Sequence, residues 1–265
     1  MQFEVDGHRV FAATGGRAFD ADKPAVIFIH GAGLDHVCWQ LQSRWFAWHG
    51  WSSLAIDLPG HGRSGGAPLA SIDAMADWVI RLMTAAGLER AALVGHSMGA
   101  VIALEAAARA PTRISHLSLL GVSSSMPVHP ALLAAAKDDP PKAYDMMTTW
   151  CHSAPARLGG HPAPGLWMTG SSRALLDLNR PGVLASDLAA CNAWTSGPDS
   201  AKQVTCPTQF ILGTDDVMTP VKKGAELAAL VAGAKVTTIP GCGHIMMAEA
   251  PDAVLDALKA HLRAA

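Results

Sequence analysis

The sequence of this 265-residue chain predicts an α/β fold, in which a mostly parallel central sheet is flanked by helices on both faces and carries a helical insertion. Short apolar segments rich in β-branched residues alternate along the chain with helical segments. Most of these apolar segments lack the alternation of a strand that is covered on one face only. One long interval has no such segment. This order predicts right-handed crossovers and a ligand site beyond the carboxyl ends of the strands.

The expected elements follow one another in a regular order. Residues 3–5 and 9–14 predict an antiparallel pair that turns at Asp6-Gly7, because Asp-Gly is favoured in two-residue hairpin turns. Buried strands are expected at residues 24–30, 52–58, 91–96, 116–121, 207–213 and 235–240. Helices are expected at about 71–86, with Gly87 as the stop, and at 98–109, 221–232 and 251–263, the last opened by Pro251.

The interval without strands, residues 122–204, is predicted to be a helical cap. It contains prolines, large apolar residues and helix-like pieces such as "KAYDMMTTWCH". The predicted domains are therefore a first part of the α/β core at 1–121, the cap at 122–204 and a second part of the core at 205–265. An inserted cap that folds over the strand ends is a common way to close a site.

Large apolar side chains of the cap are candidates for the wall of a substrate pocket. Both a pocket wall and the small core of the cap need such residues, so the sequence leaves the two alternatives open. The pocket hypothesis assigns substrate binding to Met126, Trp150, Trp167 and Trp194.

Composition narrows the classes of function. The chain is 50% hydrophobic and 16% charged, which allows a large core, and its formal net charge is −2. A charge this small gives no basic field, so nucleic acid is not expected as a partner. No apolar run approaches the roughly 18 residues of a membrane span, and no signal sequence is evident. The sequence leaves a homodimer open.

The five cysteines are odd in number, scattered and never in a CxxC pair. This pattern fits neither a disulfide framework nor a zinc site, and it suits a reducing cytoplasm. A cytoplasmic protein without a metal is therefore expected.

The stretch "LVGHSMGA", residues 93–100, is a candidate nucleophile turn. It places Ser97 between Gly95 and Gly99, after an expected strand and before an expected helix. A nucleophile that projects from a tight turn leaves no room for side chains two residues away on either side. Met98 begins the helix, so its backbone N–H is free and lies at the positive end of the helix dipole. An anion beside Ser97 would be stabilised there.

A serine hydroxyl needs a base, and the base needs an orienting carboxylate. His244 follows the last expected strand in "IPGCGHIMMAEAP", and Asp215 and Asp216 follow the preceding strand in "FILGTDDVMTP". Both stretches lie at the edge of the sheet where Ser97 is expected. Each residue alone could be a solvated or helix-capping side chain, but the three placements together favour a catalytic triad.

A small loop, "IHGAG", follows a buried strand and is expected beside the nucleophile. There the Ala32 N–H would join the Met98 N–H in a two-donor hole for a tetrahedral oxyanion. We expect His30 in this loop to be structural.

Five motifs together resemble the α/β-hydrolase fold. They are "HGAG", "DLPGHGRS", "GHSMGA", "LGTDDVMTP" and "GCGH", in the order of that family, and the resemblance covers about residues 24–121 and 204–262. It implies that Ser97 is the nucleophile and that His244 is the general base and then the acid. It also implies Asp216 as the carboxylate, because the family usually runs Gly, two residues, Asp and then a Pro four residues on; Asp215 is the fallback.

The neighbours of the nucleophile refine what the resemblance implies. The histidine directly before the nucleophile, His96, resembles the pattern of esterases, lipases and thioesterases. At this position the carbon–carbon hydrolases of the family more often have Asn, and the perhydrolases of the family more often have Phe. A serine at position 97, in place of aspartate, speaks against dehalogenase and epoxide hydrolase chemistry.

The sequence therefore predicts a serine hydrolase that cleaves a small to medium apolar carboxylic ester or thioester through an acyl-enzyme on Ser97, with no metal or cofactor. Its expected partner is a small-molecule ester. One alternative is a carbon–carbon bond hydrolase or lactonase that uses the same triad. Another is a non-catalytic small-molecule binder on the same fold.

Overall fold

A computed structural model of the chain describes residues 1–161 and 165–262. Its centre is an eight-stranded sheet in the order β1-β2-β4-β3-β5-β6-β7-β8, and the strands from β4 through β8 in this order run parallel, which confirms the predicted fold class. At the other edge, β1 pairs with β2 and β2 pairs with β4, and both pairings are antiparallel. The strands are β1 (Gln2–Val5), β2 (His8–Ala13), β3 (Ala25–Ile29), β4 (Ser52–Ile56), β5 (Ala91–His96), β6 (Ile114–Leu120), β7 (Thr208–Gly213) and β8 (Lys235–Ile239).

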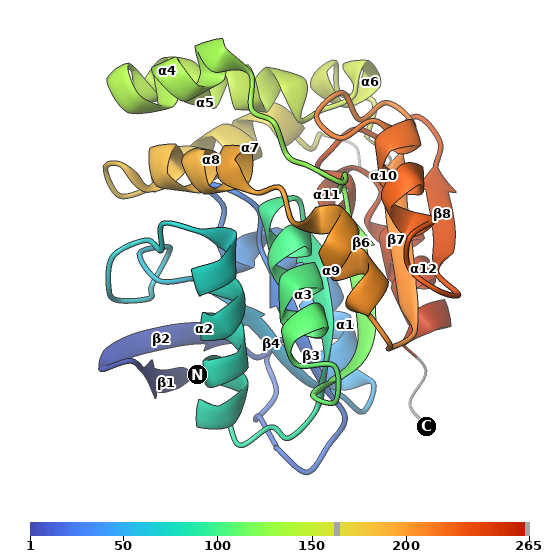
Figure 1. The fold of residues 1–265 in the computed structure, drawn as a ribbon. Coiled ribbons are helices and arrows are strands. Elements are labelled where there is room, and N and C mark those ends of the chain that lie inside the picture. Colours follow the sequence, from blue (N-terminus) through green and yellow to red (C-terminus); the bar gives the residue numbers. More distant parts are fainter. Residues whose placement is uncertain (162–164, 263–265) are drawn as a thin grey trace.

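Helices cover both faces of the sheet. On one face α2 (Ile72–Ala85), α3 (Met98–Arg109), α9 (Gly197–Gln203) and α10 (Val221–Ala228) pack side by side, and on the other face α1 (Gln40–Trp48) packs against α12 (Pro251–His261) (Figure 1). Because helices lie on both sides, every residue of β3, β4, β5 and β7 is buried. This double burial explains why these strands read as continuous apolar runs.

Helix α1 is absent from the sequence-based prediction. It follows a short 3₁₀ helix, His36–Trp39, and its buried residues include the polar Gln42 and Ser43 beside Phe46. Gln42 donates through Nε2 to the carbonyl of Met247 at 3.0 Å, so tertiary contacts determine which face is buried. Such a helix has no clean apolar stripe for the sequence to reveal.

In the described part of the interval between β6 and β7 there are six helices. They are α4 (Pro130–Asp138), α5 (Pro140–Trp150), α6 (Ala154–Arg157), α7 (Met168–Asp177), α8 (Val183–Ala193) and α9. Figure 1 shows that α4 to α8 gather at one end of the sheet, whereas α9 packs beside α3 on its flank. Among the described residues, no helix is long and apolar enough to cross a membrane.

Candidate active site

Ser97 occupies the turn from β5 into α3 with a backbone that is rare for a non-glycine residue, φ 54° and ψ −117°. Such strain persists only where the surroundings enforce it, and it is frequent at functional sites. The flanking glycines are sterically required: a Cβ on Gly95 would lie 2.1 Å from the carbonyl oxygen of Gly99, and one on Gly99 would lie 2.2 Å from that of Ile29. The turn therefore projects Ser97 beyond the end of the strand.

Asp216 and His244 are brought together from two separate loops. Nδ1 of His244 lies 2.8 Å from Oδ2 of Asp216, and both residues are buried. Asp216 also accepts the hydroxyl of Thr219 on Oδ2 at 2.6 Å and the N–H groups of Met218 and Thr219 on Oδ1. Asp215 is exposed and accepts only the hydroxyl of its neighbour Thr214 among the described residues.

These contacts keep Asp216 ionised. Burial alone, the largest effect, would raise its pKa, but the charge of His244 and the hydrogen bonds from His244 and Thr219 outweigh burial and lower the pKa below its usual value. The carboxylate is thus an acceptor at neutral pH. When His244 donates its Nδ1–H to Asp216, its Nε2 is free to accept a proton.

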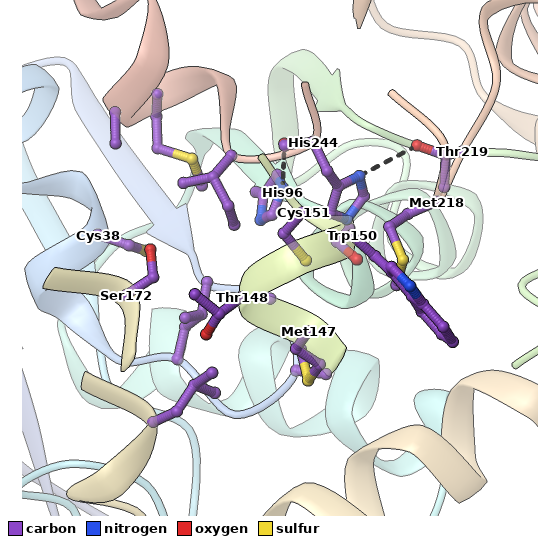
Figure 2. A pocket seen from close by; sticks show the side chains of 18 of the residues that line it. Cys38, His96, Met147, Thr148, Trp150, Cys151, Ser172, Met218, Thr219 and His244 are labelled. Atoms are coloured by element: carbon purple, nitrogen blue, oxygen red, sulfur yellow. Dashed lines mark hydrogen bonds between the residues drawn. The ribbon is translucent and has the colours of Figure 1, made fainter. Parts of the chain in front are cut away.

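His96 contacts His244 and is hydrogen-bonded to it (Figure 2). Its Nε2–H donates to the backbone carbonyl of His244 at 2.9 Å, and the two rings lie 4.7 Å apart. Burial, followed by the charge of His244, lowers the pKa of His96 to about 3, so this ring is neutral at physiological pH. It adds no positive charge beside the candidate base.

A cavity of about 470 Å³ opens beside Ser97 and His244. Its wall is mostly apolar. One part of the wall comes from α4, α5, α7 and α8, which shows that these helices lie over the carboxyl ends of the strands, and the rest comes from loops and core segments around Ser97 and His244. Met126 and Trp150, two of the candidate substrate-binding residues, contribute to the wall, together with Leu132, Met147, Leu176, Leu188 and Cys191. Figure 2 shows Trp150 near Met218 on one side of the cavity and Thr148 with Ser172 on another.

One of the two predicted oxyanion donors lines this cavity, and the other directly follows Ser97, which lines it. Ala32 contributes to its wall, and Met98 is the first residue of α3. Among the described residues, neither backbone N–H has a hydrogen-bond partner. Free N–H groups at such positions are suited to bind a developing negative charge.

Two tryptophans do not line the cavity, which corrects the expectation for both. Trp167 is 74% exposed at the start of α7. Trp194 is buried where α8 meets α9, and its Nε1–H donates to Oε1 of Glu105 on α3 at 2.8 Å. Trp194 therefore attaches the inserted helices to the core. Sequence position alone did not distinguish these environments.

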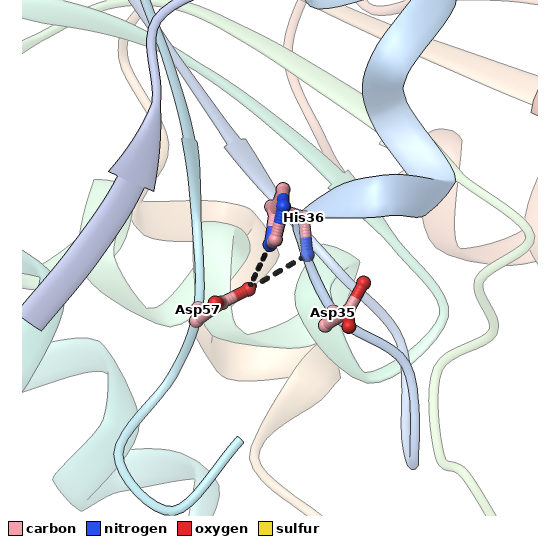
Figure 3. A group of neighbouring side chains, drawn as sticks. All are labelled: Asp35, His36 and Asp57. Atoms are coloured by element: carbon pink, nitrogen blue, oxygen red, sulfur yellow. Dashed lines mark hydrogen bonds and ion pairs between the residues drawn. The ribbon is translucent and has the colours of Figure 1, made fainter. Parts of the chain in front are cut away.

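A second side-chain group, which the sequence analysis did not single out, links two loops beside the site (Figure 3). Oδ1 of Asp57 accepts both the backbone N–H and the Nδ1–H of His36 at 2.8 Å, and Oδ2 accepts the N–H of Arg63. Asp35 instead caps the 3₁₀ helix by accepting from Val37. The candidate ligand atoms of Asp35, His36 and Asp57 lie within 4.8 Å of one another, but their hydrogen bonds explain this proximity as a tie between loops.

Comparisons with known proteins agree with this fold. The sequence model of a family described as "Alpha/beta hydrolase family" matches residues 26–257. The chain is 28% identical over 262 residues to the pimeloyl-(acyl-carrier protein) methyl ester esterase of Methylococcus capsulatus, covering 89% of this chain and 91% of that protein. The crystal structure of the enol-lactonase from Burkholderia xenovorans matches with a TM-score of 0.88 at 24% identity and full coverage of both chains.

One further relative matches over a shorter region. The dihydrolipoyllysine-residue acetyltransferase component of the acetoin cleaving system of Cupriavidus necator is 40% identical over 122 residues. This match covers 44% of the present chain and 30% of that protein, so it spans less than two thirds of the relative's length.

Proposed function

The chain belongs to the alpha/beta hydrolase family, and on this basis we propose that it is a serine hydrolase of small to medium apolar carboxylic esters or thioesters. The observation that carries the proposal is the buried 2.8 Å contact between Asp216 and His244, at the wall of a cavity to which Ser97 also contributes. A serine, an imidazole and a carboxylate in this order are the groups that acyl transfer requires.

In the proposed mechanism, His244 takes the proton of Ser97 as its Oγ attacks the carbonyl carbon of the ester. The tetrahedral oxyanion is bound by the N–H groups of Ala32 and Met98. His244 then gives its proton to the leaving alcohol or thiol as the acyl-enzyme forms. Water, activated by the same histidine, adds to the acyl carbon and releases the acid and the free serine hydroxyl. Asp216 holds the imidazole and stabilises its charged form.

We propose that the helices of residues 122–204 form the cap that selects the substrate, with α9 as its attachment to the core. The wall they contribute is mostly apolar, and no Asp, Glu, Lys or Arg is among the described residues that line the cavity. Arg173 pairs with Asp145 and Asp177 instead. A neutral apolar acyl or alcohol group would replace water in this cavity at a gain, whereas a charged group would lose hydration without a partner.

The first prediction concerns substrate length. Neutral esters with medium-sized apolar or aromatic groups should exceed acetate esters in kcat/KM by about tenfold or more, because burying one such side group contributes about 2 kcal/mol. Trp150→Ala should narrow this ratio without reducing fluorophosphonate labelling of Ser97. The measurement is a series of p-nitrophenyl esters of increasing acyl length.

Trp167→Ala is the matched control, since Trp167 is 74% exposed and contributes nothing to the wall of the cavity. It should leave the length preference as in the parent chain. Equal turnover of acetyl and longer esters, or an equal effect of the two tryptophan substitutions, would argue against an apolar acyl pocket.

A further inference from the structure

A buried carboxylate outside the Asp216–His244 pair joins three segments of the fold. Asp187 lies on α8 and is 0% exposed. Its Oδ2 accepts the backbone N–H of Gly33 at 2.9 Å and contacts Nε2 of His61 at 2.8 Å. Gly33 follows β3 and His61 follows β4. One oxygen atom thus holds α8 against two loops at the carboxyl end of the sheet.

The surroundings of His61 require a proton on both ring nitrogens. Nδ1 faces the carbonyl of Pro59 at 3.0 Å and Nε2 faces the carboxylate of Asp187, and both partners only accept. Burial, the largest effect, lowers the pKa of His61, but the charge and hydrogen bond of Asp187 outweigh it and raise the pKa above its usual value. The charges of Asp57 and Asp35 also favour the imidazolium.

The adjacent imidazole of His30 is neutral, so the positive charge stays on His61. The two ring centres lie 4.8 Å apart. His30 donates through Nδ1–H to the carbonyl of Gly31 at 2.9 Å and accepts the N–H of Leu58 on Nε2 at 3.1 Å. Burial, followed by the charge of His61 itself, lowers the pKa of His30 to about 4.

The peptide that carries the Ala32 N–H is fixed on its opposite side. The carbonyl of Gly31, in the same peptide, accepts from Nδ1 of His30 and from the N–H of Leu34 at 3.1 Å. Because the N–H and C=O of a trans peptide point in opposite directions, these bonds hold the Ala32 N–H from one side, and its direction also depends on how the following peptide is held.

The next two peptides are held by the inserted segment, one by α8 and one by the loop between α7 and α8. The Gly33 N–H donates to Asp187, and the Gly33 carbonyl accepts from Nδ2 of Asn179 at 2.7 Å. Gly33 has φ +66°, a region in which a glycine turns freely unless its peptides are held. Without Asp187, the Gly33 N–H loses its acceptor, so the peptide that joins Ala32 to Gly33 loses its own hydrogen bond and the Ala32 N–H loses one of the supports of its direction.

We propose that Asp187 is a positioning residue that, together with His61, fixes the loop of Ala32 and so sets the direction of one oxyanion donor from the cap. This inference rests on the proposed function, because it assumes that the Ala32 N–H binds the oxyanion. A buried ion pair often stabilises a fold no more than apolar side chains of the same volume. What the pair adds here is a fixed direction for the loop.

The test compares Asp187→Asn and Asp187→Leu with Arg180→Gln. Arg180 also attaches the inserted helices to the loop of His61, through Nη2 to the carbonyls of Gly62 and Ser64, but it does not contact Gly33. Measurements are kcat and KM for a p-nitrophenyl ester, the thermal transition, and the Ki of an aryl trifluoromethyl ketone. Ser97 adds to this ketone to form a hemiketal whose oxyanion needs both donors.

Both Asp187 substitutions should lower kcat by about tenfold or more and raise Ki by a similar factor, with KM changed less than about threefold. Complete loss of one oxyanion donor lowers kcat by roughly 10²–10³-fold, and a misdirected donor lowers it less. Arg180→Gln should stay close to the parent chain in kcat and Ki.

The pH profile provides a readout that a purely structural role would not change. A raised pKa means that the imidazolium is present at lower pH and is lost as pH rises through that pKa. In the parent chain kcat should therefore fall at alkaline pH as His61 loses its proton. In Asp187→Asn this fall should move to lower pH, because no carboxylate holds the proton.

Unchanged kcat and Ki in both Asp187 variants would overturn the inference, and so would equal losses in Asp187→Asn and Arg180→Gln. If both Asp187 variants lose their thermal transition, Asp187 serves folding alone and the inference is also overturned. Absence of fluorophosphonate labelling on Ser97 in the parent chain would instead refute the proposed function. The two failures are therefore distinguishable.

Discussion

Replacing Ser97 with alanine is expected to abolish labelling by a fluorophosphonate probe and to lower kcat for ester hydrolysis by roughly 10⁵–10⁶-fold. The strained turn between Gly95 and Gly99 presents this hydroxyl at the wall of the cavity, and alanine removes only its oxygen. The fold should remain, since the bonds of the turn are made by backbone, such as the 2.9 Å contact from Ser97 N–H to the carbonyl of Leu120. Peptide mapping of the labelled protein gives the measurement.

Ser125→Ala is the control for this substitution, because Ser125 is exposed and lies in the loop after β6. The Ser125→Ala variant should be labelled by the probe on Ser97 and should hydrolyse esters at the same rate as the parent chain. A probe adduct on Ser123, Ser124 or Ser125 would move the nucleophile away from position 97 and contradict the assignment.

Asp216→Asn is expected to lower kcat by about 10⁴-fold, whereas Asp215→Asn should change it by less than about tenfold. An amide at position 216 favours the wrong tautomer of His244 and removes the charge that stabilises its imidazolium. Asp215 is exposed and its carboxylate contacts only Thr214 among the described residues, so its charge acts through solvent. Steady-state kinetics on one ester compare the two variants.

The adjacent aspartates make this a matched pair of isosteric changes. If the loss at position 215 exceeded the loss at 216, the catalytic carboxylate would have to be reassigned. The lowered pKa of Asp216 adds a pH criterion. Its ionised form is present above the ordinary pKa of an aspartate and is lost only as pH falls through the lowered value, so its protonation should not limit activity in mildly acidic buffer.

Local patterns explain how much of the fold could be predicted. The strands β3 and β5 are apolar on both faces, and helix α3 begins directly after the turn of Ser97, so their positions follow from neighbouring residues alone. Parallel strands then place the loops after β7 and β8 at the same edge, which is why Asp216 and His244 could be proposed as partners. Thr219, which donates to Asp216, gave no separate signal.

The features that were missed depend on contacts between distant segments. Trp150 and Trp167 are the same residue type in the same insertion, yet one lines the cavity and the other is exposed. Trp194 is held by Glu105, which lies 89 residues earlier in the chain. Asp187 contacts His61 across 126 positions. No local periodicity encodes such pairs, so a single sequence gives no basis for predicting them.

Rapid-quench mass spectrometry detects the proposed acyl-enzyme on Ser97 itself. The parent chain is mixed with p-nitrophenyl butyrate, quenched in acid within the first turnover, digested and mapped. We expect one butyryl group on the peptide that contains Ser97, formed at the rate of p-nitrophenol release and absent in Ser97→Ala. A butyryl group on any other residue, or steady hydrolysis with no acylated peptide under conditions that show a burst of p-nitrophenol, would contradict this expectation.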